Sequence, residues 1–318
     1  MTRPAPFRPP PLLGNRHLQT VLGSRLRLTR DPPAVTCLVP LPDGDRLALE
    51  VSTPAGWRTG DRVAVLVHGL CGSHRSIYMV RIAAKLVAAG VRVARVNLRG
   101  NGSGAGLARR PYHAGCSDDL QVALEAVHAD APASPVWLVG FSLGGNVALK
   151  LAGELGTGAP GWLAAVGAVC PPVDLVASWR RLCQPAGLPY QRLFVGWLRD
   201  EMRRRHAAMG ELAPALPRRL GLFEFDDRYT APRVGFPDAM TYYTRASALP
   251  LLARIAVPCR ALVATDDPIV DPAWLERASL PAGTELMTSP RGGHLGFLGA
   301  PARWFMDEVV LSWVLAAR

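Results

Sequence analysis

Ser142 stands in the run Gly140-Phe141-Ser142-Leu143-Gly144, a spacing in which a serine hydroxyl can attack a carbonyl carbon. The run lies between an apolar stretch at 136–139, which predicts a strand, and a helical pattern at 144–154. A sharp strand–turn–helix connection exposes the serine and requires small residues beside it, which accounts for the two glycines. Glycine and serine are common, so this context makes Ser142 the candidate nucleophile.

A serine hydroxyl needs a base to take its proton. In the strand–turn–helix arrangement the order along the chain is serine, acid, histidine. Only His206 and His294 of the seven histidines follow Ser142. His294 ends a glycine-containing loop after the last predicted strand, whereas His206 lies in a basic helical pattern. We therefore expect His294 to be the base.

The acid that orients the histidine is expected after the penultimate strand, where Asp266 and Asp267 are adjacent. Asp267 directly precedes a Pro-Ile-Val turn and is the preferred candidate, with Asp266 as the alternative. Asp174, after the preceding strand, is a more remote candidate.

Acyl transfer also requires hydrogen-bond donors for the oxyanion. The run His68-Gly69-Leu70-Cys71-Gly72 follows a buried strand pattern, and we expect the backbone N–H groups of Leu70 and Leu143 to be these donors. His68 precedes the serine and is interpreted as a brace of the loop. Cys71 has no motif of its own and is interpreted as a pocket-wall residue.

Strand and helix patterns alternate along most of the chain, which predicts a mostly parallel sheet with helices on both faces. The candidate residues all fall after strands, at the edge where such sheets bind ligands. The predicted strands are 34–39, 47–52, 63–67, 91–98, 136–139, 163–170, 259–264 and 285–288. The predicted helices are 77–89, one from Ser117, 144–154, 197–211, 272–278 and 301–317.

The alternation is lost at about 171–250, a proline-containing stretch with an arginine-rich helical pattern. We expect this stretch to be a cap inserted into a single domain that spans 1–318. The first residues, to Pro11, are rich in proline and are expected to extend over the surface as part of an extension of about 30 residues.

The 318 residues are 49% hydrophobic and 19% charged, the balance of a globular chain with a large core. Neither a signal peptide nor a membrane-spanning run is evident, so a cytoplasmic location is expected. The formal net charge is +11, but no nucleic-acid motif accompanies it. A weak contact with a membrane surface stays open. The spacing of the six cysteines and the histidines predicts no metal, and a serine triad needs no cofactor.

Ten short runs together resemble the YheT-like branch of the α/β-hydrolases, also called the AB hydrolase 4 family. They are GNRHLQT at 14–20, HGL at 68–70, NLRG at 97–100, YHAG at 112–115, GFSLGGN at 140–146, FDD at 225–227, GFPDA at 235–239, YY at 242–243, DDP at 266–268 and GGH at 292–294. The resemblance covers nearly the whole chain. It implies the α/β-hydrolase fold and a serine esterase that uses Ser142, Asp267 and His294. It also singles out His17 and Gln19, whose role the sequence does not supply.

The sequence therefore predicts a cofactor-independent hydrolase of carboxylic esters, with short- or medium-chain acyl groups or lipid esters as substrates. Two alternatives stay open. One is an acyltransferase that moves the acyl group to an alcohol; the other is a binding protein that keeps the triad without using it. The physiological substrate and the oligomeric state are not readable from the sequence.

Overall fold

A computed structural model describes residues 6–299 and 303–316. The described residues form one sheet of eight strands in the order β1-β2-β4-β3-β5-β6-β7-β8. The strands are β1 (Val35–Pro40), β2 (Arg46–Ser52), β3 (Val63–Val67), β4 (Arg92–Asn97), β5 (Val136–Phe141), β6 (Leu163–Val169), β7 (Cys259–Ala264) and β8 (Glu285–Ser289). β2 pairs antiparallel with both β1 and β4, and the pairs from β4 to β8 are parallel. The predicted mostly parallel sheet is therefore confirmed.

The central strand β3 shows why the sheet is covered on both faces. All five of its residues are buried, and they alternate between two hydrophobic cores because successive side chains of a strand point to opposite faces. Val63, Val65 and Val67 belong to one core, and Ala64 and Leu66 belong to the other. A continuous apolar run of this length is typical of a strand that is buried on both sides.

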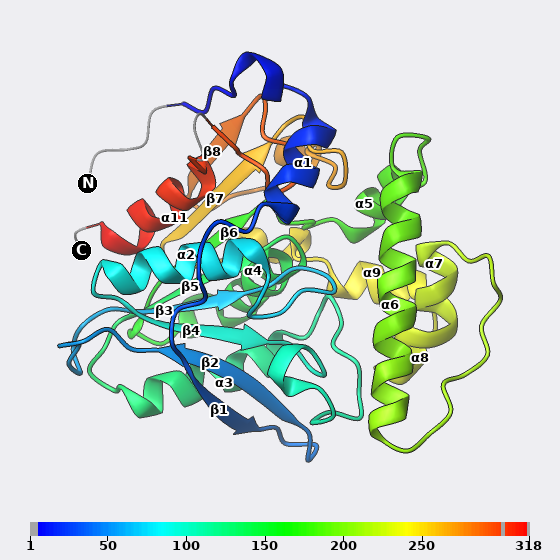
Figure 1. Ribbon diagram of the computed structural model, residues 1–318, viewed down its shortest axis with the longest axis horizontal. Coiled ribbons are helices and arrows are strands. Elements are labelled where there is room, and N and C mark those ends of the chain that lie inside the picture. Colours follow the sequence, from blue (N-terminus) through cyan, green and yellow to red (C-terminus); the bar gives the residue numbers. More distant parts are fainter. Residues whose placement is uncertain (1–5, 300–302, 317–318) are drawn as a thin grey trace.

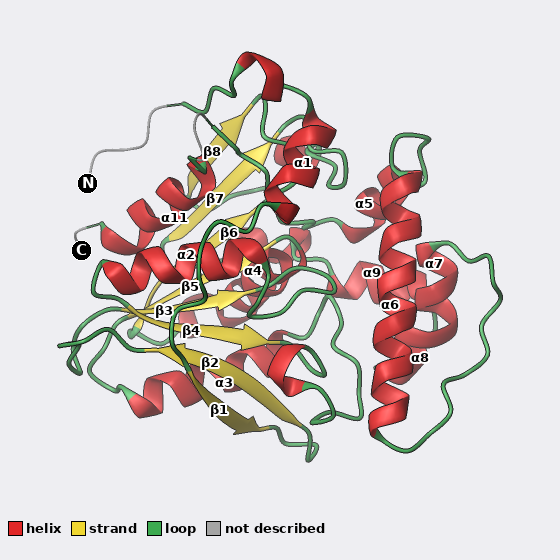
Figure 2. Ribbon diagram, viewed as in Figure 1, coloured by secondary structure: helices red, strands yellow, loops and turns green. Residues whose placement is uncertain are grey.

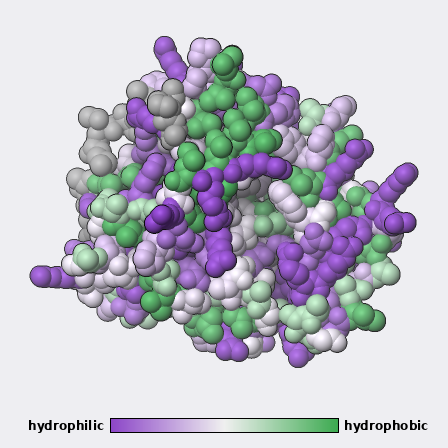
Figure 3. Space-filling view, viewed as in Figure 1, coloured by the Kyte–Doolittle hydropathy of each residue, from purple (hydrophilic) through white to green (hydrophobic). Residues whose placement is uncertain are grey.

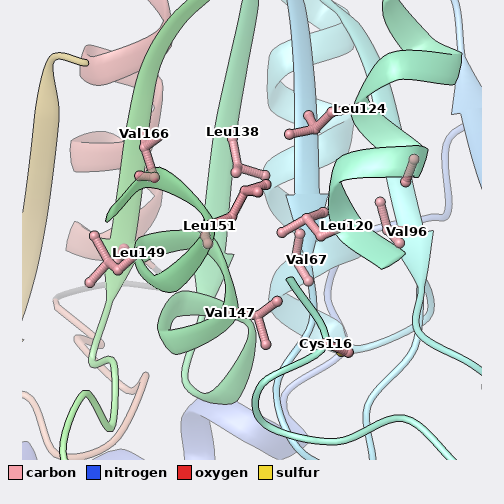
Figure 4. Packing of buried hydrophobic residues seen from close by; sticks show 14 of the residues in the cluster. Val67, Val96, Cys116, Leu120, Leu124, Leu138, Val147, Leu149, Leu151 and Val166 are labelled. Atoms are coloured by element: carbon pink, nitrogen blue, oxygen red, sulfur yellow. The ribbon is translucent and has the colours of Figure 1, made fainter. Parts of the chain in front are cut away.

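Helices pack on each face (Figures 1 and 2). α2 (Ile77–Ala88) and α11 (Phe305–Leu315) contact each other on one face, while α3 (Ser117–Asp130) and α4 (Leu143–Leu155) contact each other on the opposite face. Figure 4 shows α4 side chains, Val147 and Leu151 among them, packed among strand residues and α3. Most of α4 is buried all round, so the helix that follows Ser142 is held firmly in place.

Between β6 and β7 the chain forms a group of helices that lies beside the sheet (Figure 1). We call these helices, α5 to α9, the helical segment. They are α5 (Leu175–Leu182), α6 (Leu188–Ala208), α7 (Leu222–Phe225), α8 (Ala231–Arg233) and α9 (Ala239–Ala246). The remaining short elements are α10 (Trp274–Arg277), the 3-10 helices at Pro11–Leu13, Gly102–Gly104, Gly156–Gly158 and Leu249–Arg254, and a π-helix at Asp226–Thr230.

Three expectations from the sequence need correction. The N-terminal part contains a helix, α1 (Arg16–Arg25), that the sequence did not predict, and Phe7 is buried against the rings of Phe297 and Phe305. α6 begins nine residues before the predicted start at 197, because Pro189 is compatible with a first helical turn. The last helix begins at Phe305, and the predicted first-turn Pro301 lies outside the described residues.

Candidate active site

Ser142 occupies a strained turn between β5 and α4. Its φ is 50° and its ψ is −122°, a conformation that a non-glycine residue rarely adopts. The positions of Gly140 and Gly144 lie so close to neighbouring backbone atoms that a side chain would not fit at either. A Cβ on Gly140 would lie 2.2 Å from the carbonyl oxygen of Gly144, and a Cβ on Gly144 would lie 2.5 Å from the carbonyl oxygens of Val67 and His68. The steric reason expected for the two glycines is present.

His294 lies on the loop after β8 and reaches Ser142. Its Nε2 is 2.8 Å from Ser142 Oγ, and the ring is 9% exposed. The other ring nitrogen, Nδ1, is 2.7 Å from Asp267 Oδ2. The structure thus brings three of the predicted residues into one chain of hydrogen bonds.

Asp267, rather than Asp266, faces the histidine. Its Oδ1 accepts hydrogen bonds from the N–H groups of Ile269 and Val270, at 2.8 and 2.9 Å, which leaves Oδ2 for His294. Asp266 accepts instead from the N–H of Gly293 at 2.9 Å and braces the loop on which the imidazole stands.

Asp174 and His206, the less favoured candidates for the acid and the base, have other partners. Asp174 caps α5 through the N–H of Ala177 and pairs with Arg277. His206 pairs with Glu211 at the end of α6. Neither belongs to the chain of hydrogen bonds at Ser142.

The contacts of Asp267 determine which nitrogen of His294 carries the proton. A carboxylate without a proton only accepts hydrogen bonds. Asp267 is buried, at 1% exposed, and its two oxygens face the N–H groups of Ile269 and Val270 and the Nδ1 of His294. Nδ1 of His294 is therefore the donor in this pair. Nε2 is left with a lone pair that accepts the hydroxyl proton of Ser142, as general-base catalysis requires.

The predicted oxyanion donors lie on the loop after β3 and at the start of α4. Leu70 and Leu143 both line the cavity that contains the serine. Among the described residues, neither N–H group has a hydrogen-bond partner. The loop is fixed one residue further along, where the N–H of Cys71 donates to the hydroxyl of Tyr112 at 2.8 Å. The N–H groups of Leu70 and Leu143 are thus free to bind a ligand oxygen.

His68 is a brace of this loop, as its place in the sequence suggested. Its Nε2 accepts from the N–H of Leu98 at 3.1 Å, so Nδ1 carries the proton and donates to the carbonyl of Gly69 at 2.7 Å. Complete burial lowers the pKa of His68 to about 4, so the ring stays neutral. Burial also raises the pKa of the Cys71 thiol well above its usual range, which makes that sulfur a poor nucleophile.

A largely apolar cavity opens over Ser142 between the sheet and the helical segment. The centre of a water molecule can occupy about 110 Å³ of this cavity. Its apolar wall includes Leu70, Leu143, Leu175, Trp179, Leu182, Phe194, Leu198, Met202, Leu222, Phe225, Ile269 and Val270. Two buried carboxyl groups also line it, and burial raises the pKa of Glu201 to about 7 and that of Asp226 to about 6. The chemistry that suits such a wall is binding of a hydrocarbon chain.

Two side chains that support the site were missed by the sequence reasoning. Tyr112 holds the Leu70 loop through Cys71, and its position inside the YHAG run was the available signal. Arg181 of α5 donates two hydrogen bonds, at 3.0 and 2.7 Å, to the backbone carbonyl of Asp267. No sequence signal distinguished Arg181 from the other arginines, because its partner is distant in the chain.

Donor atoms of Cys170, Asp267 and His294 lie within 4.8 Å of one another, a separation that could hold a metal ion. The side chains do not fit that role. Burial raises the pKa of the Cys170 thiol well above its usual range, whereas a metal binds the thiolate. Both ring nitrogens of His294 are engaged, with Ser142 and Asp267. The cluster is better explained as the hydrogen-bonded histidine beside a neutral buried thiol.

The sequence of the chain is similar to those of known hydrolases. The sequence model of the "Alpha/beta hydrolase family" matches residues 64–308. The chain belongs to the alpha/beta hydrolase family. The "Putative esterase YheT" of Escherichia coli (strain K12) is 32% identical over 98% of this chain and 93% of its own length. The predicted resemblance to the YheT-like branch is therefore confirmed.

Two further matches have lower sequence identity. The "Monoacylglycerol lipase ABHD2" of Danio rerio is 26% identical over 96% of this chain and 79% of its own length. The esterase Pf2001 of Pyrococcus furiosus shares the fold, with a TM-score of 0.58 and 16% identity over 91% of this chain and 99% of the solved chain. The chain is thus a hydrolase of the alpha/beta superfamily. No helix among the residues described is long and apolar enough to cross a membrane.

Proposed function

We propose that this alpha/beta hydrolase cleaves carboxylic esters with Ser142 as nucleophile, His294 as base and Asp267 as the group that orients the histidine. The observation that carries the proposal is the continuous chain of hydrogen bonds from Ser142 Oγ through His294 to Asp267 Oδ2, at 2.8 and 2.7 Å. Its position beneath an apolar cavity supports ester chemistry, because a hydrocarbon group can be held there while the carbonyl reaches the serine.

The steps follow from the orientation of each group. Ser142 Oγ attacks the ester carbonyl while His294 Nε2 takes its proton, and the N–H groups of Leu70 and Leu143 bind the oxyanion. Collapse of the tetrahedral intermediate breaks the ester bond, and His294 returns the proton to the departing alcohol. Water then attacks the acyl-enzyme by the same route, which releases the acid and restores the serine.

The cavity suggests the substrate class. Its wall is formed mainly by leucine, aromatic and other apolar side chains from the sheet edge and from α5, α6 and α7. We therefore propose short- or medium-chain acyl esters or lipid esters as substrates. The helical segment would act as a cap within a single domain, because it forms the wall of the cavity opposite Ser142. No cofactor is required by these steps.

A weak contact with a membrane surface, in a cytoplasmic protein, is part of the same proposal. The outer side of α6 carries the exposed apolar residues Leu188, Leu193 and Trp197, with the exposed Arg192 among them. Figure 3 shows hydrophilic side chains gathered on the right of the view, over the region of α6. An exposed arginine and an exposed tryptophan on the same helix are a combination suited to an anionic lipid surface.

Activity against p-nitrophenyl esters of increasing acyl length, measured for wild type and Ser142→Ala, tests the proposal. The wild type is expected to hydrolyse these esters and to be labelled covalently by a fluorophosphonate, while folded Ser142→Ala does neither. Unchanged turnover in the variant would refute the role of Ser142. A wild type that neither turns over any ester nor reacts with the fluorophosphonate would refute the esterase proposal.

A further inference from the structure

The run Asn15-Arg16-His17-Leu18-Gln19-Thr20 has no part in the chemistry described so far, yet it forms the first turns of α1. Asn15 caps this helix, since its Oδ1 accepts from the N–H groups of His17 and Leu18 at 2.9 and 3.1 Å. The cap fixes where the helix begins, and hence which side chains it presents to its neighbours. One of those neighbours is the loop that carries His294.

The His294 loop has an irregular backbone, and among the described residues its strand-like pairing is limited to an isolated bridge between Leu298 and Trp304. Gly292, Gly293, Leu295 and Phe297 all have positive φ angles, which for the two non-glycine residues is an unfavourable conformation. Such a segment keeps one conformation only where surrounding groups impose it. Asp266 is one such group, since it accepts from the N–H of Gly293, and α1 supplies others.

Gln19 binds the far end of the loop through its side-chain amide. Its side chain is 1% exposed, and its Oε1 accepts from the N–H of Leu298 at 2.7 Å while its Nε2 donates to the carbonyl of Leu298 at 3.0 Å. Nε2 also donates to the carbonyl of Leu13 at 2.8 Å. The amide therefore ties the loop to the N-terminal segment in both hydrogen-bonding directions.

Thr20 contacts the histidine directly. The backbone N–H of His294 donates to Thr20 Oγ1 at 2.9 Å, and the Thr20 hydroxyl donates its own proton to the carbonyl of Arg16 at 2.8 Å. Because that proton is engaged, the oxygen is oriented as an acceptor toward His294. Thr20 is 7% exposed, so water cannot easily replace it.

The two backbones also touch without any side chain between them. A Cβ on Gly23 of α1 would lie 2.7 Å from Cα of Gly296. On its other side, α1 meets the helical segment, where His17 Nδ1 is 2.8 Å from the hydroxyl of Tyr190 and the two rings stack. The helix is thus fixed between α6 and the His294 loop.

We propose that Thr20 and Gln19 are positioning residues for His294, and that α1 determines where the imidazole stands relative to Ser142. This inference rests on the proposed esterase function. Reacting groups need to be held in an attack geometry, and a displacement of about 1 Å can reduce the rate by about 100-fold. No residue of α1 lines the cavity, so loss of the hydrogen bonds from α1 to the His294 loop should lower kcat and leave KM nearly unchanged.

The test compares kcat and KM for a p-nitrophenyl ester in Thr20→Val, Thr20→Ser and Ser24→Ala. Thr20→Val keeps the shape but removes the acceptor, and a fall in kcat of about 10- to 100-fold is expected, with KM within about threefold of wild type. Thr20→Ser restores the acceptor and should bring kcat back to within about threefold of wild type. Ser24 is an exposed residue of the same helix, and its hydroxyl donates to the carbonyl of Val21 and to no other group among the described residues. Ser24→Ala is therefore the matched control.

Gly23→Ala keeps the inference testable should Thr20→Val not fold. Alanine favours a helix more than glycine does, yet its Cβ would push α1 away from Gly296. We therefore expect kcat to fall without a loss of helix. Full kcat in folded Thr20→Val or, failing that, in Gly23→Ala would overturn the inference, as would an equal fall in Thr20→Ser. If wild type itself is inactive toward every ester and unlabelled by a fluorophosphonate, it is the esterase proposal that fails.

Discussion

Replacing Asp267 by asparagine should reverse the direction of the hydrogen bond to His294 while leaving the fold intact. Oδ1 of Asp267 accepts from two backbone N–H groups, those of Ile269 and Val270. An asparagine must keep its carbonyl oxygen at that place, because its NH₂ group cannot accept from them. The NH₂ group then faces His294 Nδ1, which has to become the acceptor.

The consequence for catalysis follows from the tautomer. With Nδ1 unprotonated, the neutral ring carries its proton on Nε2, which faces Ser142 Oγ at 2.8 Å and can no longer accept from it. The same exchange in a Ser-His-Asp triad costs about 10⁴ in kcat. We expect a loss of about 10³ to 10⁴ for Asp267→Asn, equivalent to about 4 to 5 kcal/mol in the activation free energy.

The assay is kcat for a p-nitrophenyl ester at neutral pH, with the rate of fluorophosphonate labelling as an independent measure of the nucleophile. Asp266→Asn is the control, because its amide oxygen can still accept from the N–H of Gly293. That variant should keep kcat within about threefold of wild type, since it does not face the imidazole. More than a tenth of wild-type kcat in Asp267→Asn, or a larger loss in Asp266→Asn, would refute the reasoning.

Three further predictions concern other parts of the molecule. Burial raises the pKa of Glu201 from 4.5 to about 7, so the stability that its protonated form contributes is fully present below pH 4.5 and is lost as the pH rises through 7. Between pH 5 and 8 the unfolding free energy of the wild type should therefore fall by about 2.5 kcal/mol more than that of Glu201→Gln in denaturant unfolding, and parallel pH profiles would contradict this. Gly144→Ala should lower the free energy of unfolding by about 3 kcal/mol because its Cβ would meet two backbone oxygens, whereas the Cβ of Gly161→Ala meets nothing within 4 Å and that variant should be close to neutral. Thermal unfolding measures the difference, and equal melting temperatures for the two variants would refute the steric argument. The wild type should co-sediment with vesicles that contain anionic lipid at low salt and should be released at high salt, and Trp197→Ala should reduce the fraction that sediments. Recovery of the wild type in the supernatant at low salt would rule the contact out.

Much of the sheet could be predicted because its signals are local. The strand at Val63–Val67 has the predicted bounds, since a continuous apolar run has few alternatives to a doubly buried strand. α2 ends at Ala88, one residue before the predicted end and just ahead of Gly90, whose positive φ of 82° suits a helix terminus. By contrast, α1 has a weak apolar pattern, so its helical state depends on the Asn15 cap and on packing against the His294 loop.

The nucleophile candidate, its glycine neighbours and the order serine, acid, histidine could be read from residue type and local spacing alone. The choice between Asp266 and Asp267 as the carboxylate that faces the imidazole required the folded chain. The two are adjacent in the chain, and their difference lies in which carboxylate meets a ring that is 27 residues away. The role of Gln19 and Thr20 likewise depended on a contact that joins residues more than 270 positions apart. Such contacts form only when the sheet brings the ends of distant strands together, and no local pattern records them.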